Sequence, residues 1–403
     1  MKTTKLLLIF ALVTVVAGAI FIPNVAYAMQ PWNVQLQMRF NGKIYHYNLW
    51  QNAQYLDETA LQNRGVYLGI NGKNQLVNQL VKQGFSYRQS AYYVLVGIAD
   101  LFNQMQQAET ERRDAVARFC PQNKQKFTYE QGCDGVQVDV DATLKKILSG
   151  TTVFDVPVVV HKAVTIDQLQ EATRLRSTYS TTFNLGNANR VKNLQVCANK
   201  IRGTRVGVGQ AFSFNQVVGE RTESNGFSNA KVILDGNYVD GVGGGVCQVA
   251  STLYNAVLLA DLQVTTLYQH SLVSTYVPPS FDAMVSYPNA DFCFANNTDS
   301  DIYMDCFVQG NKLVVNLYGK PCNYQISCES VILQQTPATI QYKTATPSDN
   351  LPQGQQRVVT NGSDYVKSQA YLLYHKGGKL LKRVKIRQNE YKMSPKVVLI
   401  NPN

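Results

Sequence analysis

The sequence has little charge and few residues that bind metals. Only 16% of its 403 residues are charged, and it contains four histidines and two tryptophans. It has no HExxH, HxH or CxxC motif, so a catalytic zinc site is not indicated. It also lacks a P-loop and the glycine fingerprint of dinucleotide-binding domains. These absences exclude the usual signatures of zinc hydrolases, nucleotide hydrolases and dehydrogenases. We therefore expect no metal, no cofactor and no nucleic-acid partner.

Long apolar runs are scarce too. One stretch, Leu6–Ile22, carries 17 uncharged and mostly apolar residues, after Lys2 and Lys5 and before the small-residue triplet at 26–28. This layout is typical of an export signal cleaved at that triplet, and the run is also long enough for an uncleaved membrane anchor. We therefore expect 1–28 to be a signal peptide or a membrane anchor. The rest of the chain is expected to be exported, in the cell wall or anchored to the membrane.

The positive charge is concentrated near the C-terminus. The formal net charge is +11, and the segment 330–403 alone contains 11 basic and three acidic residues, a net charge of +8. A basic module on an exported protein predicts attraction to an anionic surface, such as that of cell-wall polymers.

The chain contains eight cysteines, and cysteines of exported proteins ordinarily form disulfides. Spacing favours three pairs: Cys120 with Cys133, Cys293 with Cys306, and Cys322 with Cys328. The first and third pairs enclose short loops. For the second pair we expect a hairpin centred on 296–300 that brings the two cysteines opposite one another. Cys197, in NLQVCANKI, is expected to be buried as a small apolar residue.

Cys247 follows a glycine-rich loop. The segment GVGGGVCQVASTLYNAVLLADL joins the glycines of 241–245 to apolar residues at helical spacing. This predicts Cys247 in the first turn of a buried helix, where unpaired N–H groups and the helix dipole favour the reactive thiolate. Backbone groups around Gly244, Gly245 and Gln248 are then the expected oxyanion donors. A flexible loop before a helix with one structural cysteine is the alternative.

A cysteine nucleophile needs a base, and the sequence offers four histidines: His46, His161, His270 and His375. His270 follows the predicted helix and precedes SLVSTYVPP, so the returning chain is expected to bring it towards Cys247. Asp282, in SFDAMVSY, is the candidate that orients the imidazole, which gives the chain order Cys, His, Asp. Arg221 is a candidate for binding a substrate carboxylate, and a structural ion pair is an equal alternative for it.

Three motifs in this region resemble a known family. FSFNQVVGERTESNGFSNAKVILDG, GVGGGVCQVASTLYNAVLLADL and YQHSLVSTYVPPSFDAMVSY follow one another as they do in VanW domains. The resemblance runs from about 182 to 320, and we expect the domain to occupy 182–329. The chain departs from the family at Val208-Gly209, where Pro-Gly is usual, and at Cys197, where a small Ala is common. Neither departure touches the candidate nucleophile.

The resemblance carries expectations about function. VanW domains are named after a glycopeptide-resistance cluster and occur on exported bacterial proteins, and some members are identified as L,D-transpeptidases. The resemblance therefore implies a transferase that acts on peptidoglycan stem peptides, with Cys247 as nucleophile, His270 as base and a thioester intermediate on the way to 3-3 cross-links. Two alternatives stay open. One is a cysteine peptidase that hydrolyses stem peptides with the same residue order, and the other is a non-catalytic wall-binding or assembly protein in which Cys247 is structural.

The flanking segments complete the predicted architecture. Residues 29–181 look like the α+β peptidoglycan-binding domain that often precedes such domains, and 330–403 is similar to the small β-rich wall-associated G-five module. The alternation in YLLYHKGGKLLKRVKI independently predicts a hairpin that turns at Gly377-Gly378. Helices are expected at 73–83, 86–117 (as one helix or two), 141–149, 165–175, 188–201 and 247–260. We expect an α+β multidomain protein, with a mixed VanW-type domain and a β-rich C-terminal module.

Overall fold

The computed structural model describes residues 35–48, 70–95, 97–234 and 237–402, and these form two compact units. The described residues up to Arg113 and those of 133–163 make up the first unit, and the remaining residues make up the second. The expected signal or anchor lies outside the described residues. Nowhere in the described ranges is a helix long and apolar enough to cross a membrane.

The first unit contains a small sheet, a group of helices and a two-stranded ribbon. The sheet has the order β2-β1-β6, with β1 antiparallel to β2 and parallel to β6, and β5 pairs with β7 in the ribbon. Alternate side chains of β1 (Leu36, Met38 and Phe40) enter the core, because neighbouring side chains of a strand point to opposite faces. The elements are β1 (Gln35–Phe40), β2 (Lys43–Asn48), α3 (Ile70–Lys82), α4 (Tyr87–Val94), α5 (Ile98–Gln106), β5 (Gly135–Val138), α6 (Val140–Leu148), β6 (Val153–Asp155) and β7 (Val158–His161).

Of the two possibilities for 86–117, one helix or two, the structure has two, and the expected helical extent beyond Gln106 is wrong. The chain forms two helices there, α4 and α5, and the second begins after Gly97, whose φ of +75° is the left-handed conformation that favours glycine. Beyond α5 the chain leaves the helical conformation, and Thr110 forms a β-bridge with Val136. The apolar pattern of this segment therefore belongs to two short helices and a stretch of bridged backbone.

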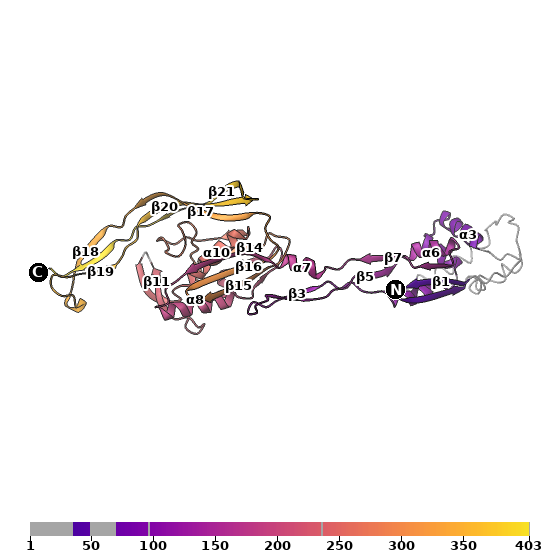
Figure 1. Ribbon diagram of the computed structural model, residues 1–403, viewed down its shortest axis with the longest axis horizontal. Helices are drawn as coiled ribbons and strands as arrows, with labels where there is room; N and C mark the ends of the chain where they lie inside the picture. The colour runs from indigo at the N-terminus through magenta and orange to yellow at the C-terminus, as the bar shows by residue number, and fades with distance from the viewer. Residues whose placement is uncertain (1–34, 49–69, 96, 235–236, 403) are drawn as a thin grey trace. The chain divides into compact units, whose positions relative to one another are not determined.

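The second unit is built on a four-stranded antiparallel sheet of order β8-β16-β15-β9, whose two central strands, β15 and β16, are labelled in Figure 1. Helix α10 packs against β8 and β16, and α8 packs against β15. Nearly every residue of α10 is buried, since β13 and β17 also contact it. The elements of this layer are β8 (Leu175–Thr182), α8 (Ala188–Ile201), β9 (Arg205–Val206), α10 (Val246–Leu259), β15 (Ile302–Gln309) and β16 (Lys312–Tyr318).

Smaller elements surround this layer. A three-stranded sheet has the order β10-β14-β13, and the pairs β11–β12 and β3–β4 form antiparallel ribbons. Their bounds, with those of the two short helices beside them, are β3 (Val116–Phe119), β4 (Phe127–Glu130), α7 (Ile166–Ala172), β10 (Ala211–Ser213), α9 (Phe214–Val218), β11 (Asn229–Leu234), β12 (Asn237–Val242), β13 (Gln263–Thr266) and β14 (Cys293–Ala295).

The C-terminal part of the second unit is rich in strands, as expected. The strands form two sheets, of order β17-β20-β21 and β18-β22-β19. The predicted hairpin is confirmed, because β20 and β21 meet at Gly377 and Gly378, both with positive φ. The buried face of β20, with Ala370, Leu372 and Tyr374, belongs to the same apolar core as α10. The elements are β17 (Gln325–Thr336), β18 (Ile340–Thr344), a 3₁₀ turn (Pro347–Asp349), β19 (Gln356–Thr360), β20 (Tyr365–Lys376), β21 (Lys379–Tyr391) and β22 (Lys396–Ile400).

All eight cysteines are free in this structure, so none of the three expected disulfides is present. The hairpin expected between Cys293 and Cys306 does not form, because β14 and β15 belong to different sheets. The other two pairs, Cys120 with Cys133 and Cys322 with Cys328, are likewise unbonded. Cys197 is fully buried in the apolar core, as expected, and burial raises the pKa of its thiol.

Candidate active site

The glycine-rich loop turns sharply into α10. Gly243 and Gly245 have φ values of +91° and +113°, which side chains rarely tolerate. A Cβ on Gly244 would lie 2.6 Å from the backbone oxygen of Lys231, so no side chain fits there. The loop ends with Cys247 in the first turn of α10, as predicted.

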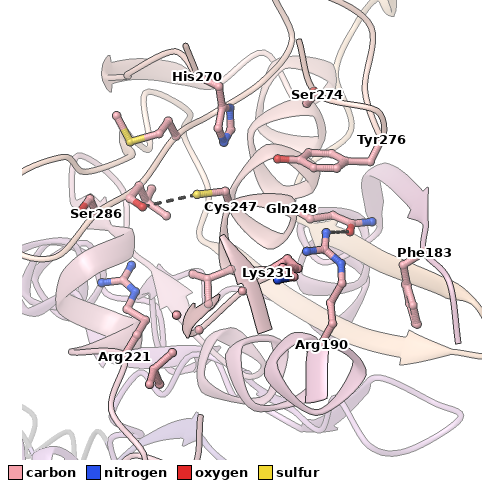
Figure 2. Close-up of a pocket in the computed structure, with 18 of the residues that line it drawn as sticks. Phe183, Arg190, Arg221, Lys231, Cys247, Gln248, His270, Ser274, Tyr276 and Ser286 are labelled. Atoms are coloured by element: carbon pink, nitrogen blue, oxygen red, sulfur yellow. Dashed lines mark hydrogen bonds between the residues drawn. The ribbon is translucent and has the colours of Figure 1, made fainter. Parts of the chain in front are cut away.

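Cys247, His270 and Asp282 lie together. The imidazole of His270 points towards the Cys247 side chain (Figure 2). Asp282 Oδ2 accepts two hydrogen bonds from His270, one from its backbone N–H and one from Nδ1, both of 2.8 Å. His270 and Asp282 are 6% and 1% exposed, and Cys247 is half-buried with its thiol 3.4 Å from the carbonyl oxygen of Val285. The structure thus brings together the three residues that the sequence predicted as a Cys, His, Asp group.

The surroundings of this group shift the two reactive side chains in opposite directions. Burial raises the pKa of the Cys247 thiol, but the hydrogen bond and charge of His270, with the charge of Arg221, bring that pKa below its usual value. Burial lowers the pKa of His270, but its contacts with Asp282 and Cys247 raise it to about 10. The contact with His270 also holds the pKa of Asp282 below its usual value, against the effect of burial. The arrangement therefore favours a thiolate paired with an imidazolium.

A cleft of about 760 Å³ opens over Cys247 (Figure 2). Its volume suits a peptide-sized ligand. Polar and aromatic side chains line it. They come from the glycine loop, α8, α10, β11, the end of β8, the segment after α9 and the segments on either side of Asp282. They include Phe183, Arg190, Glu220, Arg221, Lys231, Cys247, His270, Ser274, Tyr276, Met284 and Tyr287.

Arg221 lines this cleft with an unsatisfied donor. Its Nη2 donates to Asn215 Oδ1 at 2.6 Å, and its guanidinium lies 5.7 Å and 5.9 Å from the ring centroids of Phe214 and Tyr287. Its Nη1 is buried and has no hydrogen-bond partner among the described residues. The ion pair considered as an alternative is not found in the described part of the chain. A buried donor without a partner suits an anionic ligand.

The expectation for Gln248 is wrong. Its backbone N–H donates to the Gly245 carbonyl at 2.9 Å, its Oε1 accepts from Arg190 at 2.8 Å, and its Nε2 donates to Thr181 and Thr182. All of its donors are therefore occupied within the fold, and its role is to tie the start of α10 to β8 and α8.

The start of α10 still offers backbone donors. The N–H of Val246 is taken by the Gly243 carbonyl, whereas the N–H groups of Gly244, Gly245 and Cys247 have no partner within the described ranges. Gly245 caps the helix without a side-chain hydrogen bond. The geometry therefore leaves the N–H of Cys247 open as an oxyanion donor, together with those of Gly244 and Gly245 that the sequence predicted.

Several residues around the site were missed by the sequence analysis. Tyr276 lines the cleft (Figure 2), and burial raises its pKa. Tyr391 and Arg387, from β21, contact Asp282 through its carboxylate and its backbone oxygen. A lone arginine or tyrosine in an alternating strand carries no sequence signal for such a contact.

Two solved structures show partial similarity to this chain. The crystal structure of HP0197-G5 aligns with 20% of this chain and 100% of its own length, at 12% identity and a TM-score of 0.12. The G5 domain of an IgA1 protease aligns with 20% of this chain and 93% of its own, at 16% identity and a TM-score of 0.12. TM-scores this low carry no inference about fold or function.

Sequence comparisons are more informative. Uncharacterized protein YoaR of Bacillus subtilis (strain 168) is 42% identical over 140 residues, which are 35% of this chain and 46% of that protein. This chain thus spans about half the length of that curated relative. The family model described as VanW like protein matches residues 189–318, a range that holds Cys247, His270 and Asp282. The Cys, His, Asp group therefore lies within a range of this chain, 189–318, that matches the VanW family.

Proposed function

We propose that this chain is a cysteine acyltransferase that cross-links peptidoglycan stem peptides by L,D-transpeptidation, outside the cytoplasmic membrane. The observation that carries the proposal is the Cys247, His270 and Asp282 group beneath a peptide-sized cleft. Its opposed pKa shifts supply a thiolate nucleophile and an imidazolium acid at neutral pH. The export signal or anchor expected at 1–28 supports a location at the cell wall.

The first half of the reaction forms a thioester. The Cys247 thiolate attacks the carbonyl carbon of the third stem residue, and the N–H of Cys247 donates to the oxyanion. The peptide bond to the terminal D-amino acid then breaks, and the His270 imidazolium gives its proton to the leaving amine. The products of this step are a free D-amino acid, a neutral imidazole and the acyl-enzyme.

The second half transfers the acyl group. The side-chain amine of a neighbouring stem attacks the thioester carbonyl, and neutral His270 takes the proton that the amine loses. The C–S bond breaks as the new amide bond forms, which restores the thiolate and imidazolium and creates a 3-3 cross-link. Asp282 remains ionised throughout and stabilises the imidazolium.

Arg221 fits this substrate. The leaving D-amino acid carries a free carboxylate, and the unpaired Nη1 of Arg221 lies in the lining of the same cleft as Cys247. A charge-assisted hydrogen bond from that nitrogen would satisfy both groups. Arg221 is therefore the proposed carboxylate-binding residue.

The C-terminal strands fit a wall location. The first half of β21 is exposed and carries several cations: Lys379, Lys382, Arg383 and Lys385. Arg383 is paired with Glu329, so the others contribute most of the unbalanced charge. We assign anionic wall polymers as the partners of this surface.

Intact-mass analysis tests the proposal. Residues 29–403 are incubated with tetrapeptide-stem muropeptides, beside the variants Cys247→Ala and Cys293→Ala. The second variant is the matched control, because Cys293 is also partly exposed but lies in β14 and does not line the cleft. We expect a thioester adduct and cross-linked dimers from the native chain and from Cys293→Ala, and neither from Cys247→Ala.

Other outcomes would replace the proposal. Shortened monomers without dimers would make the protein a peptidase. Absence of any product, together with a Cys247 that resists alkylation, would leave a wall-binding or assembly protein.

A further inference from the structure

The end of β21 is bonded to both segments that carry the acid–base pair. Asn389 donates to Gln269, next to His270, and the Lys392 N–H donates to the Ser271 carbonyl at 2.7 Å. Arg387 Nη1 donates to the backbone oxygen of Asp282, also at 2.7 Å. These contacts come from a strand that lies outside the matched VanW range, 189–318.

Tyr391 completes the hydrogen bonding of the Asp282 carboxylate. Oδ2 is occupied by His270, which leaves Oδ1 for another donor. The Tyr391 hydroxyl donates to Oδ1, and it accepts from the backbone N–H of Ser280 at 2.7 Å. Tyr391 is only 1% exposed, so water does not replace it. This hydrogen bond lowers the pKa of Asp282.

The loop before Asp282 also depends on the C-terminal strands. Ser280 has a φ of +69°, a left-handed conformation that is strained for a residue with a side chain. Its hydroxyl lies 2.8 Å from that of Ser368 in β20, and its N–H is bonded to Tyr391. Strained backbone persists where surrounding contacts fix it, and here those contacts come from β20 and β21.

We propose that Tyr391 is a positioning residue, through which the C-terminal sheet holds Asp282 in the orientation that His270 requires. The inference rests on the proposed function of the Cys247 site. It makes the β-rich C-terminal module part of the active site as well as a wall-binding surface. A purely structural role would instead make Tyr391 one of several interchangeable contacts between the sheet and the rest of the unit.

A change in the pH profile of Cys247 can be interpreted only if the charged and titratable groups around the site are known. Those that act on Asp282 are His270, Tyr391, Arg387, Tyr254 and Tyr276, and those that act on Cys247 are His270, Arg221, Tyr276 and Cys197.

Tyr391→Phe tests the proposal, with Tyr374→Phe as its control. Both side chains are at least nine-tenths buried in the same sheet, and the Tyr374 hydroxyl donates to the Asp261 carboxylate at 2.8 Å, outside the site. Each variant thus loses one tyrosine-to-aspartate hydrogen bond and keeps its ring. Thermal unfolding shows whether the two changes affect folding alike.

The readout is the rate of Cys247 alkylation as a function of pH, followed by peptide mass spectrometry in the full chain. Loss of the Tyr391 hydroxyl lets the Asp282 carboxylate turn away, so His270 binds its proton less tightly and the thiolate loses its counter-ion. We expect Tyr391→Phe to move the acid limb of the profile about one pH unit higher, which lowers the rate about tenfold at a given pH on that limb, the loss appropriate to one hydrogen bond to a charged group. Tyr374→Phe should stay within about twofold of the native chain.

Two results would overturn the proposal: an unchanged profile in Tyr391→Phe, or an equal change in Tyr374→Phe. Because alkylation needs no stem peptide, the result does not depend on transpeptidation. Failure of the muropeptide assay with a changed Tyr391→Phe profile would refute the proposed reaction and leave the positioning role standing.

Discussion

Replacing Asp282 with asparagine removes the negative charge that His270 faces. Asparagine has nearly the same shape, so it can still accept a hydrogen bond from Nδ1. What is lost is the charge, and a hydrogen bond to a charged group stabilises by about 1.5–3 kcal/mol. At about 1.4 kcal/mol per pKa unit, the pKa of His270 should fall from about 10 to ~8–9.

The direction of this pKa change determines which limb of the pH profile should move. The pKa of His270 lies above its usual value of 6.5, so the imidazolium persists at neutral pH and is lost as the pH rises through about 10. We expect kcat/KM for dimer formation to follow a bell-shaped profile, with its alkaline limb set by the Cys247–His270 pair. In Asp282→Asn that limb should move ~1–2 pH units towards neutrality.

Asp261→Asn is the matched control. Asp261 also accepts a hydrogen bond from a tyrosine, Tyr374, and its φ of +56° is a conformation that asparagine tolerates well. Its profile should match that of the native chain. If the alkaline limb stays in place in Asp282→Asn, or moves equally in Asp261→Asn, the assigned role of the carboxylate is refuted.

Three further predictions concern other features. Arg221→Gln should raise KM about tenfold for stems with a free terminal carboxylate and leave KM for amidated stems unchanged, as steady-state kinetics on the two substrates would show. Gly244→Ala should destabilise the fold by about 1–3 kcal/mol in urea unfolding, because the added Cβ would clash with the backbone oxygen of Lys231, which cannot move as a side chain could. Asp305→Ala should cost about 3–5 kcal/mol in the same assay, since Asp305 is fully buried against Arg202 and Lys126 and its loss leaves those cations unpaired.

Local patterns were sufficient for the elements that carry the nucleophile. The apolar spacing after the glycines predicted a helix at 247–260, and α10 begins one residue earlier and ends one residue earlier. The helix expected at 188–201 matches α8 at both ends. In each case the apolar residues at helical spacing are the ones that pack into the core, so their spacing alone predicts the helix.

Predictions failed where the partner of a segment lies far away in the chain. The Cys293 and Cys306 segments looked like the two strands of a hairpin, but β14 pairs with β10 and β13 and β15 pairs with β16 and β9. Gln248 was expected to face a substrate, but Arg190, Thr181 and Thr182 take up its side chain. No local pattern reports which distant residue completes such a hydrogen bond.

Distant contacts also explain why the site includes residues from outside the range that matches the VanW family. The matched range contains Cys247, His270 and Asp282, so the residues that resemble a catalytic group are all local to it. Yet Oδ1, the carboxylate oxygen that His270 does not occupy, accepts its hydrogen bond from Tyr391, 109 residues further along the chain than Asp282. A buried carboxylate that lacked this donor would carry an unsatisfied acceptor at the point where orientation matters most. The family motif therefore accounts for which residues react, and the C-terminal strands account for how firmly they are held.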